Sequence, residues 1–333
     1  MFNLRLRDLD IPASGRKSLK RTLDAEQYYT DIYNECIRRV IYATQLPPAS
    51  ITLVDYGGGH GLLGITAKRI GIGRVIYVDI NADAVDTMRS VAAKMGIGPD
   101  VVLQGDAYTL RQWCDENGVV PQALIAIDVI EHIYVLDEFF AQIYAVNPAI
   151  AMVFTTASTP YNKRVVRRLH KAMQRDEKGT ARKKGFLQMR REHIMELHPD
   201  MSEREAEFWA ENTRGLDFED VARAVDSRSP NLLLDPYNTC DPRSGSWTER
   251  ILPIDDYRQL LMPYGFALHV LPGRYNQYRH GPKAWISRHY NKRIDKAPDH
   301  DPRTFRERRS MRRALKVAPY IYLIVDAERE SKK

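Results

Sequence analysis

The residues best suited to chemistry in this sequence are an acid and three glycines at alternate positions. Asp55 is followed by Gly57, Gly59 and Gly61, between an apolar stretch and a helix-like one. Glycines in such a turn leave room for a ligand beside the backbone, since they carry no side chain. The amides at the start of the following helix would point at that ligand. The pattern therefore predicts a nucleotide-type binding site at a strand-to-helix turn.

Two classes of ligand compete for this turn. Gly59, Gly61 and Gly64 match the G-x-G-x-x-G spacing of dinucleotide-binding proteins. In that class the first glycine directly follows the strand, whereas here an acid and two more glycines precede it. A carboxylate at the strand end attracts an ammonium group and would not help to hold a pyrophosphate. S-adenosylmethionine (SAM), which carries an ammonium group, therefore fits better than a dinucleotide.

The glycine turn belongs to an alternating series of strands and helices. We predict strands at 51–55, 74–79, 101–104, 123–127 and 150–156, and helices at 24–44, 62–69, 82–95 and 136–145. Such alternation produces a parallel sheet with helices on both faces, and ligands bind at the carboxyl ends of its strands. Asp79, Asp106 and Asp128 fall at such ends, as Gly57 does. Their co-location predicts one shared site.

Two long polar segments interrupt the series. We divide the chain into an N-terminal extension (1–23), a cofactor-binding core (24–160), a helical insertion (161–246), a return of the core with a helix and a strand (247–272), a basic insertion (273–313), and a closing strand with a tail (314–333). Residues 1–20 are polar and basic, which predicts an extended or mobile segment. A basic run from Lys163 to Lys184 is expected to form a solvated helix face or to hold an acceptor.

Composition limits the class of protein but not its partner. The 333 residues are 44% hydrophobic and 28% charged, which is ordinary for a soluble chain. We find no apolar signal region and no apolar run near the roughly 20 residues that span a membrane, and we expect a cytoplasmic protein. Three widely spaced cysteines predict neither a disulfide framework nor a metal site. A net charge of +7 permits nucleic acid, anionic lipid or a phosphorylated substrate without selecting among them.

Several motifs together resemble the class I SAM-dependent methyltransferases. They are Asp55-x-Gly57-x-Gly59-x-Gly61, Asp79, Gly105-Asp106-Ala107 and Asp128-Val129-Ile130-Glu131-His132. The last motif is most similar to the Asp-Val-Leu-Glu-His of the ubiquinone-biosynthesis O-methyltransferase group. The resemblance covers 24–160 and 247–271, and it leaves out both insertions. It implies a Rossmann-like, doubly wound α/β sheet of seven strands in the order 3-2-1-4-5-7-6, with the last strand antiparallel.

The resemblance also implies roles for individual residues. The residues that it assigns to SAM are Asp55, Gly57, Gly59, Gly61, Asp79, Ile80, Asp106, Ala107 and Asp128. The glycines would lie beside the methionine part of SAM, and the first acid would orient its ammonium. Asp79 would bind the ribose hydroxyls. Asp106 and Ala107 would contact the adenine, and Asp128 would lie near the methyl group.

Methyl transfer to an oxygen benefits from a base that removes its proton. His132 is our first candidate, and Glu131 would orient it or act itself. The opposing interpretation is that both side chains only brace the loop by hydrogen bonds. We expect no metal site.

The acceptor remains open at this stage. We expect a small molecule, a sugar or a lipid precursor methylated at oxygen, with the basic run at 163–184 able to hold an anionic one. RNA methylation through the same basic run is the second hypothesis. A catalytically inactive SAM-binding protein and a nicotinamide-dependent oxidoreductase are two further alternatives.

Overall fold

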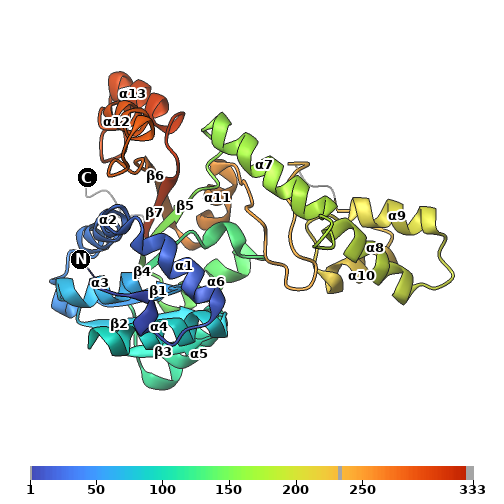
Figure 1. Ribbon diagram of the computed structural model, residues 1–333, viewed down its shortest axis with the longest axis horizontal. Coiled ribbons are helices and arrows are strands. Elements are labelled where there is room, and N and C mark those ends of the chain that lie inside the picture. Colours follow the sequence, from blue (N-terminus) through green and yellow to red (C-terminus); the bar gives the residue numbers. More distant parts are fainter. Residues whose placement is uncertain (1, 232–234, 328–333) are drawn as a thin grey trace. The chain divides into compact units, whose positions relative to one another are not determined.

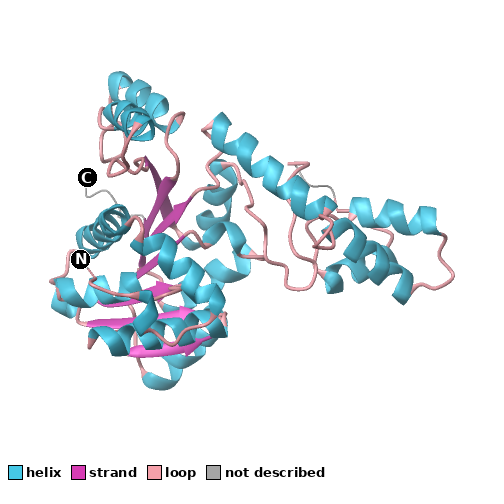
Figure 2. Ribbon diagram, viewed as in Figure 1, coloured by secondary structure: helices cyan, strands magenta, loops and turns pink. Residues whose placement is uncertain are grey.

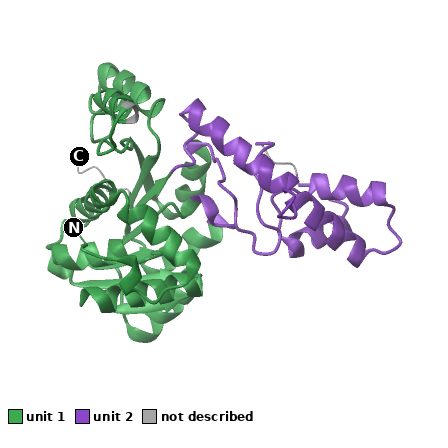
Figure 3. Cartoon of the chain, in the orientation of Figure 1, with its two compact units in different colours: residues 1–130, 137–156, 255–333 green, residues 131–136, 157–254 purple. Residues whose placement is uncertain are grey.

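The computed structural model describes residues 2–231 and 235–327 (Figure 1). The chain divides into two compact units, shown in different colours in Figure 3. Unit 1 comprises Met1–Ile130, Asp137–Thr156 and Asp255–Lys333, and unit 2 comprises Glu131–Leu136 and Ala157–Ile254. None of the helices in the described part of the chain is both long and apolar enough to cross a membrane.

Unit 1 is built on a single sheet of seven strands in the order β3-β2-β1-β4-β5-β7-β6 (Figure 2). The strands are β1 (Thr52–Tyr56), β2 (Arg74–Asp79), β3 (Val101–Gln104), β4 (Ala123–Ile127), β5 (Ala151–Thr156), β6 (Phe266–Pro272) and β7 (Ile321–Ala327). Strands β1 to β5 pair in parallel, and β7 is antiparallel to both β5 and β6. The predicted strand order and the antiparallel last strand are confirmed.

Strand β1 lies at the point in the sheet where the order of the strands along the chain reverses. It pairs with β2 on one side and with β4 on the other, while β3 and β5 extend the two halves outward. Leu53 and Val54 are fully buried, as is expected of a central parallel strand covered on both faces. In open α/β sheets the ligand crevice forms outside the carboxyl ends at this reversal. The glycine turn after β1 therefore occupies the expected place.

Helices cover both faces of this sheet (Figure 2). The helices that belong to unit 1 or border it are α1 (Ala13–Leu23), α2 (Glu26–Thr44), α3 (Leu62–Ile70), α4 (Ala82–Met95), α5 (Ala107–Asn117), α6 (Leu136–Val146), α11 (Ile254–Leu261), α12 (Pro282–Ile294) and α13 (Phe305–Leu315), with short 3-10 turns at Leu6–Asp8, Pro48–Ser50, Ile130–His132 and Met262–Tyr264. Helix α4 begins at an Asn81 side chain that accepts a hydrogen bond from the Asp83 amide. Helix α2 packs against β4, β5 and α3.

The expectation that residues 1–20 are extended or mobile is wrong. Residues 13–23 form helix α1, and Leu9, Ile11 and Leu19 are buried. The helix packs against α4, and Gly15 makes this possible because a Cβ there would meet the Thr87 hydroxyl at 1.8 Å. A segment with many charges thus folds because its few apolar residues, before and within the helix, are buried.

Unit 2 is helical. Its helices are α7 (Lys163–Lys178), α8 (Phe186–Leu197), α9 (Glu203–Asn212) and α10 (Phe218–Asp226). Trp209, Ile194 and Val221 lie at the centre of an apolar cluster from α8, α9 and α10. Arg190 is fully buried and forms an ion pair with Glu177, and the Thr239 hydroxyl donates to the same carboxylate. This paired charge links α7 and α8, so the unit has its own core.

Candidate active site

The site at the strand ends starts with Asp55, which holds the glycine turn in place. Its Oδ2 accepts a hydrogen bond of 3.0 Å from the backbone N–H of Gly64, in the first turn of α3. The side chain is 1% exposed, and burial raises the pKa of Asp55 to about 7. Asp55 therefore ties the end of β1 to the start of α3. Its predicted role at the SAM ammonium stays a prediction.

The turn itself requires glycine at two positions for different reasons. Gly57 has φ +64°, and a Cβ there would meet Val129 Cγ2 at 2.5 Å. The turn thus approaches the loop after β4 so closely that no side chain fits. Gly59 has φ +54°, yet a Cβ on it would meet nothing within 4 Å. Gly59 therefore borders open space, as is expected of a backbone that faces a ligand.

Asp79 at the end of β2 is bound to the same turn. Its Oδ2 accepts from the Gly59 amide and its Oδ1 from the Asn81 amide, both at 2.9 Å. Tyr77 adds a third link, since its hydroxyl donates to the Gly59 carbonyl at 2.7 Å. Burial raises the pKa of Asp79 above its ordinary value. Each carboxylate oxygen keeps a second lone pair, so the group can still accept hydrogen bonds from two hydroxyls.

The residues assigned to the adenine lie at the neighbouring strand ends. Asp106 caps α5, because its Oδ1 accepts from the amides of Tyr108 and Thr109 at 3.0 and 3.1 Å. Ala107 is buried behind it, and Ile80 is 76% exposed. Tyr108 is 63% exposed. Strands β2 and β3 are adjacent. The side chains of Ile80, which follows β2, and Tyr108, which follows β3, therefore border the same edge of the site.

Tyr108 is a residue that the sequence analysis missed. Its signal was available, since an aromatic residue directly follows the Asp106-Ala107 pair. An exposed flat ring beside a strand end suits contact with a purine.

Asp128, at the end of β4, completes the group of strand-end carboxylates. Its backbone has φ +53°, a left-handed conformation that is uncommon for a non-glycine residue, and its N–H donates to the Thr155 carbonyl at 3.0 Å. Helix α2 lies within range of its charge. Burial and then Asp128 raise the pKa of Tyr28, and burial, Asp55 and Asp128 all raise that of Tyr33. Helix α2 also packs against β4, the strand that ends just before Asp128.

The predicted base, His132, belongs to unit 2, and so does Glu131. The His132 Nδ1 lies 2.7 Å from the Trp247 carbonyl oxygen. Since a carbonyl only accepts, Nδ1 carries a proton, and in the neutral imidazole Nε2 is then the nitrogen with a free electron pair. The backbone N–H of Trp247 also donates to the backbone carbonyl of His132 at 3.3 Å. Glu131 is 1% exposed. The loop is therefore braced, and the same bond fixes the tautomer that a base needs.

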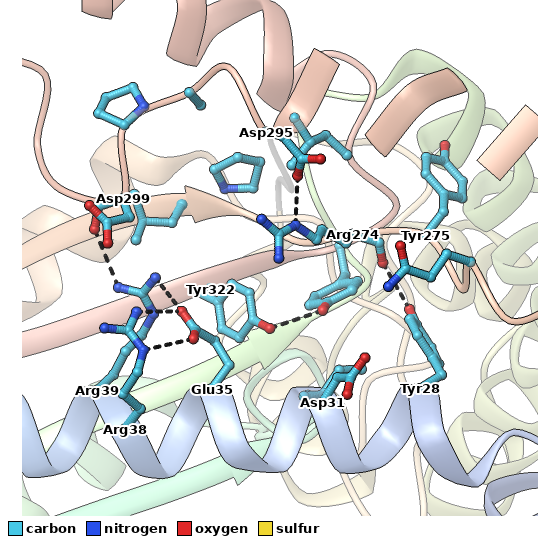
Figure 4. A pocket seen from close by; sticks show the side chains of 18 of the residues that line it. Tyr28, Asp31, Glu35, Arg38, Arg39, Arg274, Tyr275, Asp295, Asp299 and Tyr322 are labelled. Atoms are coloured by element: carbon cyan, nitrogen blue, oxygen red, sulfur yellow. Dashed lines mark hydrogen bonds and ion pairs between the residues drawn. The ribbon is translucent and has the colours of Figure 1, made fainter. Parts of the chain in front are cut away.

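A pocket of about 370 Å³ lies in unit 1 between α2 and the segment after β6 (Figure 4). Five tyrosines line it: Tyr28, Tyr275, Tyr278, Tyr320 and Tyr322. Its charged groups are mostly paired, with Arg38 and Arg39 on Glu35. The Tyr28 hydroxyl donates to the Arg274 carbonyl at 3.1 Å. Tyr28 is half-buried and lines this pocket.

Sequence reasoning missed the pocket as a whole. Its walls come from residues 28–39 and 271–322, which only the tertiary structure brings together. None of the nine residues assigned to SAM lines it. The described residues contain no cluster of three His, Cys, Asp or Glu side chains that would hold a metal ion.

Comparisons with known proteins found only partial matches. No protein-family model matches the sequence. Ribosomal protein L11 methyltransferase from Aeromonas hydrophila is 40% identical over 55 residues, which is 16% of this chain and 19% of that protein. The same enzyme from Dechloromonas aromatica is 46% identical over 46 residues, or 14% of this chain and 16% of that one. The chain thus spans at most about a fifth of the length of the curated relatives it matches.

Two solved structures resemble most of the chain. A candidate SAM-dependent methyltransferase from Listeria monocytogenes is 13% identical, with a TM-score of 0.38 over 88% of this chain and 99% of that one. A candidate methyltransferase from Bacillus halodurans is 11% identical, with a TM-score of 0.41 over 87% and 96%. These scores mark partial similarity, and the fold assignment rests on the sheet itself. Its strand order is that of the class I SAM-dependent methyltransferase fold.

The narrower resemblance to the ubiquinone-biosynthesis group stays a prediction. None of the relatives named above carries that description.

Proposed function

We propose that this protein is a SAM-dependent methyltransferase. The observation that carries the proposal is the Asp79 carboxylate, which is bound to the Gly59 amide at the strand end where the sheet reverses. Gly59 faces open space, and exposed apolar side chains border the next strand end. This arrangement offers one acid for ribose hydroxyls, one backbone surface for the methionine part, and one apolar edge for a purine.

The chemistry of each residue in the site suggests a separate role. When bound, SAM supplies a methyl group that its sulfonium charge has already activated. Asp79 would accept from the ribose hydroxyls, Asp55 would stabilise the ammonium, and Ile80 with Tyr108 would contact the adenine. Helix α2, which packs against β4 and β5, would exclude water from the site. Alignment and water exclusion are the main contributions that a protein makes to such a displacement.

His132 is the proposed base. The acceptor oxygen forms a bond to the methyl carbon while the carbon–sulfur bond breaks, and the oxygen must lose its proton to a nearby group. The bond from Nδ1 to the Trp247 carbonyl leaves Nε2 of His132 able to accept that proton. Glu131, which precedes it, would position this loop.

The proposed acceptor is a small polar molecule methylated at oxygen. The pocket of about 370 Å³ supports this choice, since small-molecule sites begin near that size. Tyr28 of α2 lines this pocket, and α2 packs against β4 and β5 of the same sheet. A sugar or a lipid precursor would also find hydrogen-bonding hydroxyls and flat faces there. The name of the curated relatives raises a protein acceptor as a second candidate.

A transfer experiment separates these acceptors. Purified protein is incubated with cell lysate and with SAM labelled on its methyl group, and the label is counted in the small-molecule, lipid, glycan, protein and RNA fractions. The proposal expects label in one of the first three fractions, and none with the Asp79→Asn variant. Label concentrated in protein or RNA would overturn the small-acceptor proposal, but it would still support a methyltransferase. No label in any fraction, with SAM bound, would favour an inactive SAM-binding protein.

A further inference from the structure

Positive charge is dense in two segments of this protein, residues 163–184 with a net charge of +8 and residues 273–320. Residues 273–320 contain 14 lysines and arginines against four acids, a net charge of +10, although the whole chain carries only +7. The remaining residues therefore sum to −3. A charge of this size on a short helical segment attracts a polyanion.

The fold presents this charge on an exposed surface. Helices α12 and α13 lie side by side (Figure 1). Helix α13 buries Met311, Ala314 and Leu315, so its basic side chains point outward. The exposed basic residues of α13 and its C-cap are Arg306, Arg308, Arg309, Arg312, Arg313 and Lys316. Within the described part of the chain, none of these six lies in an ion pair.

Flat aromatic side chains stand among these charges. Trp285 on α12 is 67% exposed and stacks on His289, with ring centroids 5.7 Å apart at an angle of 20°. Phe305, the first residue of α13, is 81% exposed, and Tyr278 before α12 is 44% exposed. Burying such rings in the core would stabilise the fold, yet they are left in solvent. Nucleobases stack on exposed rings of this kind.

The chemistry favours RNA over a lipid surface. A helix that binds a membrane needs a broad apolar face. The described residues of α12 and α13 expose three large apolar side chains, Trp285, Ile286 and Phe305, and the other exposed side chains of α13 are polar or charged. Ten of the 14 basic residues in the segment are arginines. The planar guanidinium binds phosphate with two hydrogen bonds and stacks on bases. Stacking on a protruding ring also requires an unpaired base, which a duplex does not offer.

We propose that α12 and α13 form a docking surface for single-stranded RNA. Arginines of α13 contact the phosphates, and Trp285 stacks on a base. This inference does not depend on the proposed methyl transfer, because binding to α12 and α13 needs neither SAM nor an acceptor.

The test measures binding of the full chain to a fluorescein-labelled, unstructured 20-nucleotide RNA by anisotropy, at 50–200 mM KCl. Replacing Arg309, Arg312 and Arg313 by Gln should weaken binding at least tenfold at 50 mM KCl. It should also reduce the slope of log affinity against log salt by about 2, since each phosphate contact on a single strand contributes about 0.7. Trp285→Ala should weaken binding about fivefold or more and leave the salt slope unchanged.

The matched control removes the same charge from another basic helix. Arg168, Lys171 and Arg175 are exposed on α7 of unit 2, and replacing them by Gln should change the affinity less than twofold. Circular dichroism melts show whether each variant is folded. Equal losses in both triple variants would overturn the inference, because bulk charge alone would explain them. So would absent RNA binding at 50 mM KCl, equal competition by duplex DNA, or binding to phosphatidylglycerol vesicles but not to RNA.

Discussion

At the scale of single residues, the two buried acids of the site accept hydrogen bonds from backbone amides. Asp55 accepts from the Gly64 amide, and Asp79 accepts from the amides of Gly59 and Asn81. The sequence analysis placed both acids at the ligand, and the structure adds that both also hold the turn. Spacing revealed where the acids lie, but their hydrogen bonds depend on side-chain directions that spacing does not contain.

The raised pKa of Asp55 predicts that SAM binding depends on pH. Burial raises the pKa to about 7, so the carboxyl group is largely neutral at pH 6 and largely charged at pH 8. An ammonium group binds the charged form better, so affinity should increase as pH rises through 7. We expect about a tenfold increase from pH 6 to pH 8, measured by isothermal titration. Asp55→Asn removes the ionisable group and should abolish this difference. A wild-type profile equal to that of the variant would contradict the ammonium role.

Gly57 is the glycine whose replacement should harm the site most directly. Gly57→Ala adds a methyl group 2.5 Å from Val129 Cγ2 at a backbone with φ +64°. Gly118 is a matched control, since it has φ +62° but open space around it. The left-handed backbone should cost each variant about 1–2 kcal/mol of unfolding free energy. The clash should cost Gly57→Ala about 1–3 kcal/mol more.

Urea unfolding and SAM titration test this comparison. Only Gly57→Ala should lose SAM affinity, because only its clash displaces the turn from the loop after β4. Equal SAM affinity in the two variants would show that the close approach at Gly57 does not shape the site.

The role of His132 can be separated from its bracing bond. His132→Ala removes both the base and the donor to Trp247, whereas the amide of His132→Asn can still donate to that carbonyl. If His132 is the base, both variants should lose about 10²–10⁴-fold in turnover of the labelled acceptor, with SAM affinity within twofold of wild type. Recovery of turnover in the Asn variant alone would assign His132 a structural role.

At the scale of elements, the parts foreseen best were those with regular periodicity. Helix α4 ends where its spacing predicted, and Asn81 caps it. Helix α1 was missed because its apolar residues are few and its burial depends on Gly15 meeting α4. Helix α5 was missed too, although Asp106 caps it. The tyrosine-lined pocket could not be foreseen, since residues far apart in the chain form it.

The strand β6 carries a histidine that predicts how stability depends on pH. His269 lies between the carboxylates of Asp326 and Asp301, which raise its pKa to about 9. A histidine with a raised folded-state pKa stabilises the fold fully below its unfolded value of about 6.5. That contribution is lost as pH rises through 9.

Thermal melts of wild type and His269→Gln from pH 6 to pH 10 measure this effect. Wild type should melt at a higher temperature near pH 6, and the difference should shrink through pH 9. A difference that stays constant with pH would show that the histidine acts only through its packing.

At the scale of the whole molecule, the sequence predicted the sheet better than the surfaces. Alternation of strands and helices predicted a parallel sheet, and the family resemblance implied the correct strand order. The segments outside the sheet could not be predicted in the same way. Unit 2 folds around its own apolar cluster and a buried Arg190–Glu177 pair, and neither follows from a sequence motif. The charge on α12 and α13 was visible in the sequence, but its exposure was not.

The most direct test of the central claim is isothermal titration of the purified protein with SAM and, separately, with NAD. We predict that SAM binds, that NAD does not, and that Asp79→Asn weakens SAM binding at least tenfold while its melting temperature stays within a few degrees of wild type. If NAD binds and SAM does not, the protein is a dinucleotide-dependent enzyme and not a methyltransferase. Undiminished SAM affinity in Asp79→Asn would contradict the site described at the strand ends.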